Sequence, residues 1–558
     1  MAEKIWHKFY PPGVPRTVDY EKVTISQALT RSAKKYPNRP AVDYMGKKFT
    51  YKELDDLVNR FARALTDLGV KKGDNVAVCL PNIPQVVIAD LAIFRIGAVI
   101  AQNNPLYTER ELEYQLNDSG SELIITLSLL VPRMQGLMPK TKIKKIIACH
   151  IHTYLPFPKK QLFPYVKKAM HREIDETDDV MVFENLIKKY SRDPVKDRSK
   201  WDDLATIIYT GGTTGVSKGV MLSHKNLSAN VQQIRTWFPD LVFGKDSMVA
   251  TYPLFHSAGN IISCFIIWMA WEQILIPRPE PKGIIEILKR KKPQWLPGVP
   301  TIFVGLLNDP EFRKMDLTFI KGFFSAAAPL APETLRDLKN LTGATMSEIY
   351  GMTEVSPAAT MTPSSGRIKA GTVGIPIADT DVKVMDPQTG KKELGPGETG
   401  EIIIKGPQLM MGYYNKPKET KEAVRDGWFY SGDLGFFDEE GFLSIVDRKK
   451  DMVIAGGYNI YPVEIDNILY EHPKILEACA AGVPDKYRGE TIKAFIVVKP
   501  GETLTEEEVI AYCKKNLAAY KVPKAIEFMD ELPKSVIGKV LRRKLRDMEL
   551  ERAKGPAK

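Results

Sequence analysis

The alternation of helix-like and strand-like apolar segments is the feature that most restricts how this chain can fold. Apolar residues recur at helical spacing in residues 25–36, 51–68 and 83–96, and short β-like runs such as residues 75–80 separate these segments. The alternation continues between residues 285 and 326. This order of elements predicts an α/β fold in which helices cover parallel sheets.

The chain is too long for one hydrophobic core, and its pattern changes twice. At 558 residues, two or more domains are expected. From Gly371 onward, short β-rich segments and glycine–proline turns predict a small barrel-like unit. The charged stretch 448–451 lies between two β-like runs, and the residues after it have their own α/β pattern. We therefore predict a large N-terminal domain over residues 1–447 and a small α+β domain over residues 452–558.

Composition narrows the class of protein. A hydrophobic fraction of 44% with 26% charged residues is typical of a soluble globular enzyme. The five cysteines contain no C-x-x-C pair, which argues against a disulfide framework or a zinc site and favours a reducing cytoplasm. The N-terminus has no signal-peptide core, and the longest apolar run, residues 261–271, is too short to span a bilayer. The formal charge of +11 indicates either solubility or attraction to polyanions, but no motif accompanies it that would support nucleic acid binding.

A loop rich in glycine and threonine follows the apolar run 204–209. Residues 209–220 read YTGGTTGVSKGV, in which the glycines allow the backbone to approach a ligand closely. Backbone N–H groups, hydroxyls and one lysine together form a cradle for a polyphosphate. The spacing differs from that of the common P-loop, because Lys218 follows Gly215 by three positions. We expect the nucleotide phosphates to contact Thr210, Gly211, Gly212, Thr213, Thr214 and Lys218.

The same loop contains a competing pattern. Gly215-Val-Ser-Lys-Gly219 fits G-x-S-x-G, in which Ser217 would be the nucleophile of a hydrolase, with His256 or His472 as its base. That interpretation leaves the preceding glycines and threonines and the adjacent Lys218 unexplained. We therefore favour a phosphate loop.

Five segments together resemble the acyl-adenylate-forming superfamily, which includes acyl-CoA synthetases, non-ribosomal adenylation domains and beetle luciferases. The first is the loop 209–220. The other four follow in the family's order and spacing, and they are Tyr350-Gly-Met-Thr-Glu354, Tyr430-Ser-Gly-Asp-Leu434, Asp447-Arg-Lys-Lys-Asp451 with Gly456-Gly-Tyr-Asn459, and Pro533-Lys-Ser-Val-Ile-Gly-Lys539. The resemblance extends from about residue 20 to the end of the chain.

This resemblance implies that ATP activates a carboxylate as an acyl-adenylate, with release of pyrophosphate, before the acyl group passes to a thiol. Lys539 matches the catalytic lysine that bridges the carboxylate and the α-phosphate. Thr353 matches a contact to the α-phosphate, and Glu354 matches a Mg²⁺ ligand, for which one carboxylate plus phosphate oxygens suffices. We expect Thr214 to provide a second Mg²⁺ ligand.

Other motif positions match contacts to the nucleoside. Tyr350, followed by Gly351, matches the residue that lies against the adenine ring, and Ala327 belongs to the loop beside it. Asp433 matches the aspartate that accepts from both ribose hydroxyls. Arg448 matches a second ribose contact, although a surface salt bridge is the alternative for this residue.

The resemblance also implies that the C-terminal domain is a mobile lid. Residues 448–451 form its hinge, with Lys450 at the pivot. Rotation after adenylation would withdraw Lys539 and bring Gly456 and Gly457 to a narrow channel for coenzyme A. A simple turn is the alternative for the two glycines.

Several features indicate the acid that is activated. His256 matches a residue that lines the acyl pocket, although a core histidine is the alternative for a residue beside an apolar run. The neighbours of His256 offer no carboxylate for an α-amino group, which argues against an amino acid substrate. The apolar pocket candidates, which suit a hydrocarbon tail, are Trp295, Val299, Phe303, Phe324 and Met352. The chain is most similar to medium- or long-chain fatty acid CoA ligases.

Four other functions stay open. Two are ligases, one for aromatic acids such as coumarate or benzoate, and one that loads an acyl group onto a carrier protein. The third is the hydrolase with Ser217 as nucleophile, and the fourth is a non-catalytic ATP-binding regulator.

Residues 152–171 favour a lipid substrate weakly. They interleave Tyr, Phe and Leu with four lysines, the composition of a segment at a membrane interface, but their prolines oppose one continuous amphipathic helix. A surface loop with aromatic anchors is the alternative. The oligomeric state is open, with a homodimer as one prediction.

Overall fold

The computed structural model describes residues 4–210, 217–326, 330, 332–449, 451–455, 458–485, 489–517, 521–535 and 538–554. The chain forms two compact units. Unit 1 contains Met1–Asp381 and Ile404–Phe429, and unit 2 contains Val382–Ile403 and Tyr430–Lys558. The predicted hinge at 448–451 lies within unit 2 and stays a prediction.

The first sheet of unit 1 has nine strands in the order β16-β15-β14-β13-β12-β10-β11-β1-β2. The strands from β14 to β1 are parallel, whereas β2, β15 and β16 run antiparallel to their neighbours. Their bounds are β1 Pro40–Tyr44, β2 Lys47–Thr50, β10 Ser247–Ala250, β11 Glu272–Leu275, β12 Trp295–Gly298, β13 Gly322–Ser325, β14 Thr345–Gly351, β15 Ala358–Met361 and β16 Ile375–Pro376.

The second sheet of unit 1 has eight strands in the order β19-β9-β8-β4-β3-β5-β6-β7. It is parallel from β8 to β7, and β9 and β19 add antiparallel strands at one edge. Their bounds are β3 Asn75–Cys79, β4 Val99–Gln102, β5 Leu123–Leu127, β6 Lys145–Cys149, β7 Val180–Val182, β8 Leu204–Thr210, β9 Lys218–Ser223 and β19 Gly412–Tyr413.

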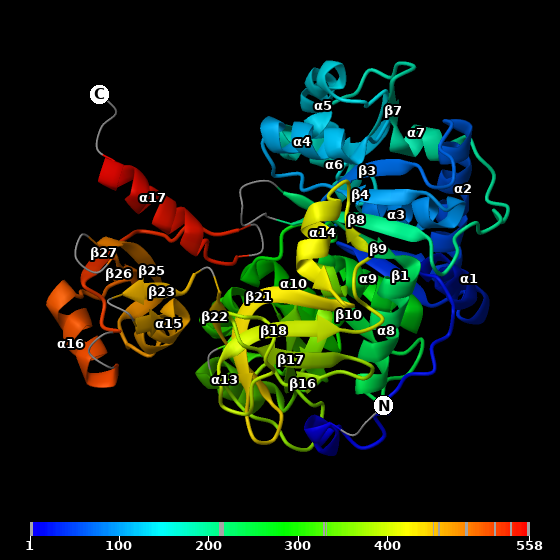
Figure 1. Ribbon diagram of the computed structural model, residues 1–558. Coiled ribbons are helices and arrows are strands. Elements are labelled where there is room, and N and C mark those ends of the chain that lie inside the picture. Colours follow the sequence, from blue (N-terminus) through cyan, green and yellow to red (C-terminus); the bar gives the residue numbers. More distant parts are fainter. Residues whose placement is uncertain are drawn as a thin grey trace. The chain divides into compact units, whose positions relative to one another are not determined.

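Helices cover the strands of both sheets (Figure 1). Local signals start several of them, since the side chains of Thr24, Thr50 and Ser223 each accept from a backbone N–H in the first turn of the following helix. The α-helices are α1 Ile25–Lys35, α2 Tyr51–Asp67, α3 Pro84–Ile96, α4 Glu109–Ser119, α5 Val131–Leu137, α6 Lys159–Val166, α7 Phe183–Lys188, α8 His224–Trp237, α9 Ser257–Met269, α10 Pro281–Lys291, α11 Pro300–Leu307, α12 Pro310–Lys314, α13 Pro332–Thr342 and α14 Pro417–Ala423. The short 3₁₀ helices are η1 Ile5–Phe9, η2 Ser128–Leu130, η3 Met138–Lys140, η4 Lys168–Met170 and η5 Thr353–Val355.

Two further sheets are described, one in the strand-rich segment and one in the C-terminal α/β segment. The first five-stranded sheet has the order β17-β18-β21-β20, with β22 paired to β21, and the second has the order β24-β23-β26-β25, with β27 paired to β26. The strands are β17 Asp381–Met385, β18 Gly400–Lys405, β20 Val424–Arg425, β21 Trp428–Phe437, β22 Leu443–Arg448, β23 Val453–Ala455, β24 Tyr458–Ile460, β25 Ile475–Asp485, β26 Gly489–Val498 and β27 Ala525–Phe528. The helices are α15 Pro462–Tyr470, α16 Glu506–Asn516 and α17 Arg542–Lys554.

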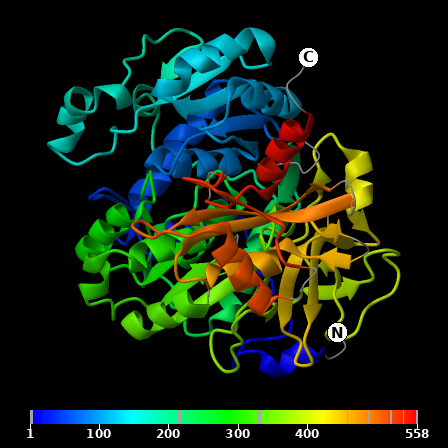
Figure 2. The same cartoon turned by 90° about the vertical axis from the view of Figure 1, so that its left-hand side faces the viewer.

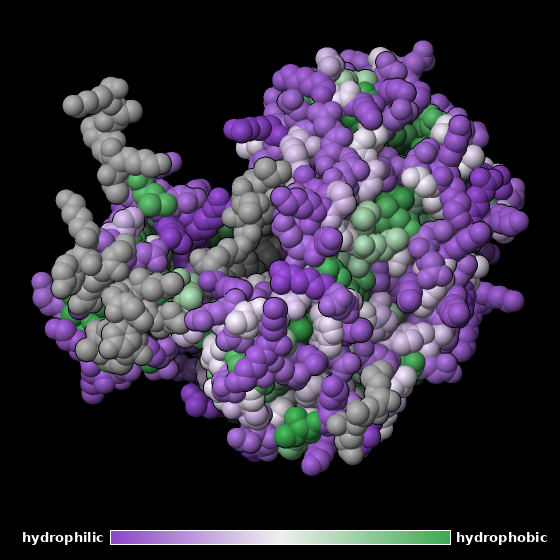
Figure 3. All heavy atoms as spheres, in the orientation of Figure 1, coloured by the Kyte–Doolittle hydropathy of each residue, from purple (hydrophilic) through white to green (hydrophobic). Residues whose placement is uncertain are grey.

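The predicted α/β fold with a smaller C-terminal part is therefore confirmed. All five cysteines are buried and free of disulfides, as their spacing indicated. No helix in the described part of the chain has the length and hydropathy needed to cross a membrane. The face seen in Figure 3 is mostly hydrophilic, with apolar residues in small groups.

Candidate active site

The predicted phosphate loop joins two antiparallel strands of the eight-stranded sheet. β8 ends at Thr210, β9 begins at Lys218, and these two residues are cross-strand partners. Residues 211–216, which include the predicted contacts Gly211, Gly212, Thr213 and Thr214, lie outside the described residues. The structure thus places the two ends of the loop, and its phosphate contacts stay a prediction.

Ser217 has two described hydrogen-bonding neighbours, and neither is a base. Its hydroxyl donates to the carbonyl oxygen of Thr210 at 2.8 Å, and Gln115 Nε2 lies 3.5 Å from the same oxygen. A hydrolase nucleophile needs a base within hydrogen-bonding reach. These contacts favour a structural role for Ser217 in closing the hairpin.

Lys218 and Glu354 meet through Tyr413, which the sequence analysis did not identify. The Nζ atom of Lys218 lies 4.8 Å from the centre of the Tyr413 ring, and the Tyr413 hydroxyl donates to Glu354 Oε1 at 2.9 Å. Tyr413 reaches this place because β19 pairs with β9. Burial and the Glu354 carboxylate raise the pKa of the Tyr413 hydroxyl, so it keeps its proton and remains a donor.

Thr353 connects this group to the start of α9. Its hydroxyl donates to Ser257 Oγ at 3.0 Å, and Ser257 is the first residue of α9. His256 precedes it as the N-cap, and its Nδ1 accepts from the backbone N–H of Ala258 at 3.2 Å. Burial lowers the pKa of His256 to about 4, so the imidazole is neutral at pH 7 and can accept this bond.

Gly351 ends β14 in a position that allows no side chain. A Cβ atom at this residue would lie 1.7 Å from the carbonyl oxygen of Pro357. Close packing of the backbone therefore requires the glycine of the Tyr350–Glu354 motif. Thr353 and Glu354 come two and three residues after this closely packed position. Tyr350, which is buried, immediately precedes it.

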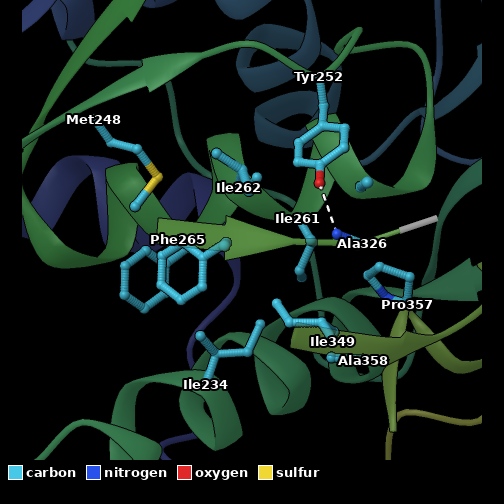
Figure 4. Close-up of a pocket in the computed structure, with 12 residues that line it drawn as sticks. Ile234, Met248, Tyr252, Ile261, Ile262, Phe265, Ala326, Ile349, Pro357 and Ala358 are labelled. Atoms are coloured by element: carbon cyan, nitrogen blue, oxygen red, sulfur yellow. Dashed lines mark hydrogen bonds between the residues drawn. The ribbon is translucent and has the colours of Figure 1, made fainter. Parts of the chain in front are cut away.

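Unit 1 also contains an apolar pocket, whose lining is drawn in Figure 4. The space inside it, counted together with open solvent at its mouth, is about 500 Å³. Ala258, next to Ser257, is one of its walls. The lining residues are Ile234, Met248, Tyr252, Ala258, Ile261, Ile262, Phe265, Phe324, Ala326, Ile349, Pro357 and Ala358.

Among the described lining residues, Tyr252 carries the only hydroxyl, and that hydroxyl is already engaged. The Tyr252 hydroxyl donates to the carbonyl oxygen of Gly298 at 2.6 Å and accepts from the backbone N–H of Ala326 at 3.1 Å. A ligand in this pocket therefore meets an apolar surface.

The structure changes the predicted composition of this pocket. Phe324 lines it, but Val299 and Phe303 pack in the hydrophobic core instead. Trp295 stacks on Phe324, with ring centres 5.3 Å apart, and does not belong to the lining. Met352 also lies outside the lining, at the N-cap of η5.

Two predicted ribose contacts are paired within unit 2. Asp433 on β21 and Arg448 on β22 are cross-strand partners, and the Ser431 hydroxyl accepts from the backbone N–H of Asp433 at 3.1 Å. Ser431 in turn donates to the carbonyl oxygen of Ile402 at 2.6 Å. The β21–β22 hairpin therefore places Asp433 and Arg448 opposite each other on adjacent strands.

Lys539 lies on an exposed turn of unit 2. The backbone N–H of Ser535 donates to the carbonyl oxygen of Lys539, and the backbone N–H of Lys539 donates to Ser535 Oγ. Gly538 has φ of 76°, a conformation that glycine adopts without strain, which explains the Gly-Lys pair. Ala327, Lys450, Gly456 and Gly457 lie outside the described residues, so their roles stay predictions.

The residues of unit 1 suit a magnesium–nucleotide complex. Within the described ranges, no group of three or more His, Cys, Asp or Glu side chains could hold a metal ion by itself. Glu354 offers one carboxylate, which Tyr413 links to the cationic Lys218, and Mg²⁺ commonly binds through one carboxylate plus substrate phosphates. The donor set thus fits Mg²⁺ brought in with ATP.

Comparison with known proteins agrees with this arrangement. The model of the AMP-binding enzyme family matches residues 29–414, and that of the AMP-binding enzyme C-terminal domain matches residues 464–539. The chain belongs to this family. These matches confirm the resemblance found in the sequence.

The alignments with similar AMP-binding enzymes extend over nearly the whole chain. The long-chain-fatty-acid–CoA ligase of Bacillus subtilis is 42% identical over 99% of both chains, and that of Escherichia coli O157:H7 is 37% identical over 98% of both chains. The crystal structure of ATP-bound MatB from Rhodopseudomonas palustris matches with a TM-score of 0.82 and 30% identity, covering 94% of this chain and 98% of MatB.

Proposed function

We propose that this protein is an ATP-dependent acid–thiol ligase that activates a medium- or long-chain fatty acid as acyl-AMP, releases pyrophosphate and transfers the acyl group to coenzyme A. The observation that carries this proposal is the pocket whose described lining is apolar and whose wall residue Ala258 adjoins Ser257, the partner of Thr353. An acyl chain in the pocket gains about 0.8 kcal/mol for each buried CH₂ group. Its carboxylate would then lie at the polar end, toward Thr353.

Some residues of the chain would supply charge to the bound nucleotide, and others would hold those groups in place. Lys218 provides a cation for phosphate oxygens, and the Tyr413 hydroxyl holds the carboxylate of Glu354 in one orientation. When bound, Mg²⁺ would neutralise phosphate charge. The neutral His256 caps α9, so the positive end of that helix faces the side of the pocket where Thr353 lies.

Relatives support the choice of acid and acceptor. The two similar enzymes of Bacillus subtilis and Escherichia coli are long-chain-fatty-acid–CoA ligases. A ligase for an aromatic acid is the second candidate, because a ring would also bind in an apolar pocket. We favour a fatty acid, since the lining residues that the structure describes offer no free polar group for the substituent of a coumarate.

The first experiment measures acid-dependent release of pyrophosphate and formation of a thioester. Fatty acids of increasing length, benzoate and coumarate are compared, with coenzyme A and an acyl carrier protein as alternative acceptors. We expect Lys539→Ala to lose adenylation, and Lys544→Ala, which replaces another exposed lysine of unit 2, to keep it. Pyrophosphate release without any dependence on added acid would contradict the proposal.

We also propose that the protein works in the cytoplasm and meets its apolar substrate at a membrane surface. A fatty acid partitions into bilayers because its chain is apolar. A homodimer stays a prediction.

A further inference from the structure

The segment that includes α6 and η4 exposes an unusual number of large apolar side chains. Phe157, Leu162, Tyr165 and Val166 are 82%, 52%, 75% and 70% exposed. They fall within ten residues at the outer edge of unit 1, in the cyan-to-teal part of the chain in Figure 2. Clustered exposed apolar residues mark an interaction surface, whereas single ones need no explanation.

The same segment carries only positive charge. Lys159, Lys160, Lys167 and Lys168 are all exposed, and no Asp or Glu occurs from residue 151 to residue 172. The lysines alternate with the apolar side chains along the chain. Long lysine stems allow the charged groups to lie at the level of phosphates while neighbouring apolar groups enter a hydrocarbon layer.

The turn between β1 and β2 extends this surface. Met45 is 45% exposed, and Lys47 and Lys48 beside it are exposed as well. A Cβ atom at Gly46 would lie 3.8 Å from Pro156 Cγ, so the turn adjoins the start of the segment. The rings of Phe49 and Tyr154 also meet edge to face, with centres 5.0 Å apart.

The segment is held in place from beneath, so its exposed side chains are part of a defined surface. Phe163 stacks on His152 with ring centres 5.4 Å apart, and His171 meets His152 with ring centres 5.0 Å apart. The Nδ1 atom of His150 lies 3.5 Å from Oε2 of Glu184 on α7, and the side chain of Leu155 is buried. These contacts fix both ends of the segment while α6 projects its apolar residues outward.

We infer that this face, which comprises Met45, Lys47, Lys48 and residues 157–170, docks on an anionic lipid bilayer. Its apolar residues would enter the interface, and its lysines would pair with anionic headgroups, each worth about a fivefold change in binding. Prolines 156, 158 and 164 keep the helix short, so the element lies on the membrane and does not cross it. The purpose that we give to docking, which is to collect an apolar acid, rests on the proposed function. Docking itself does not depend on catalysis.

The test is co-sedimentation of the full chain with vesicles of phosphatidylcholine alone or with phosphatidylglycerol added. We expect binding only to the anionic vesicles, lost by about tenfold or more in Phe157→Ser/Tyr165→Ser and in Lys167→Glu/Lys168→Glu. Two matched double variants change residues outside this face. Leu106→Ser/Val242→Ser is the control for the loss of exposed apolar side chains. Lys514→Glu/Lys515→Glu is the control for charge reversal at two adjacent exposed lysines. We expect both controls to bind as the wild type does.

Three results would overturn the inference. They are equal binding to neutral and anionic vesicles, retention of binding in both face variants, and a change of oligomeric state in those variants by light scattering, which would make the face a self-association surface. Pyrophosphate release with fatty acids from octanoate to palmitate is measured in parallel without vesicles. If the wild type lacks that activity, the proposed function fails while the vesicle result still decides the docking surface.

Discussion

Tyr413 is the residue on which the phosphate side of the site depends most. Replacing it with Phe would keep the ring under Lys218 but remove the hydroxyl that donates to Glu354. A hydrogen bond to a charged group contributes about 1.5–3 kcal/mol, so we expect acid-dependent pyrophosphate release to slow by about tenfold to a hundredfold. Steady-state rates at saturating ATP would measure the effect.

Tyr414→Phe is the control for that prediction. It removes a hydroxyl from the adjacent residue, whose partner is Asn75 Nδ2 at 3.0 Å, outside the candidate site. We expect this variant to keep its rate within about twofold, since it loses one neutral hydrogen bond only. Equal losses in the two variants would show that the Tyr413–Glu354 contact has no special role.

The same residues show which part of the site a sequence can reveal. Thr353 and Glu354 belong to a short motif and can be found from local pattern. Tyr413 and Ser257 cannot, because their contacts join residues 59 and 96 positions apart in the chain. Only strand pairing and the packing of α9 bring these partners together.

At the level of elements, β10 and α9 set the depth of the pocket. In Figure 4, Met248 and Phe265 lie at the side opposite to Ala326 and Pro357. Because Pro357 follows the Thr353–Glu354 turn closely in sequence, we assign Met248 to the deep end. Met248→Ala should therefore shift the preferred acid toward longer chains, and Met248→Trp toward shorter ones, measured as kcat/KM across a length series.

Met346→Ala is the matched control for the pocket variants. Met346 is a core residue on strand β14 of the same sheet, and it does not line the pocket. Both alanine variants should lose about 2–5 kcal/mol of stability, but only Met248→Ala should change the length preference. The same shift in both variants would contradict the assignment.

The bounds of many elements were predictable from periodicity, whereas the direction of side chains was not. The predicted helix over residues 51–68 is α2, Tyr51–Asp67, and the predicted helix over residues 83–96 is α3, Pro84–Ile96. Trp295 and Phe324 lie on the adjacent strands β12 and β13, yet only Phe324 lines the pocket. Apolar character alone does not distinguish a pocket wall from the core behind it.

At the scale of the whole molecule, buried histidines predict how stability depends on pH. Burial lowers the pKa of His224, which is fully buried, to about 4, and that of His256 to about 4 as well. Between pH of about 6.5 and 4 the unfolded chain protonates these groups and the folded chain does not. Each should therefore lower the free energy of unfolding by about 1.4 kcal/mol for each pH unit of acidification in this range.

A urea titration at pH 7 and pH 5 would measure this dependence. All seven tryptophans lie in unit 1, so their fluorescence reports the unfolding of that unit. Asp90 and Glu348, whose pKa values burial raises to about 8 and about 7, act in the opposite direction. The comparison of wild type with His224→Gln isolates the histidine, and an unchanged pH dependence in that variant would contradict the prediction.

The path of the chain between the two units has a consequence for recombination among relatives. The chain leaves unit 1 after Asp381, returns at Ile404 and leaves again after Phe429. Strands β18 and β21, which are neighbours in one sheet, come before and after the excursion that supplies Tyr413. A chimera joined between residues 405 and 428 would take these two strands from different parents, so its success would depend on the compatibility of one shared sheet. Exchange of unit 2 as a whole requires three junctions, whereas exchange of a segment at one end of the chain requires one.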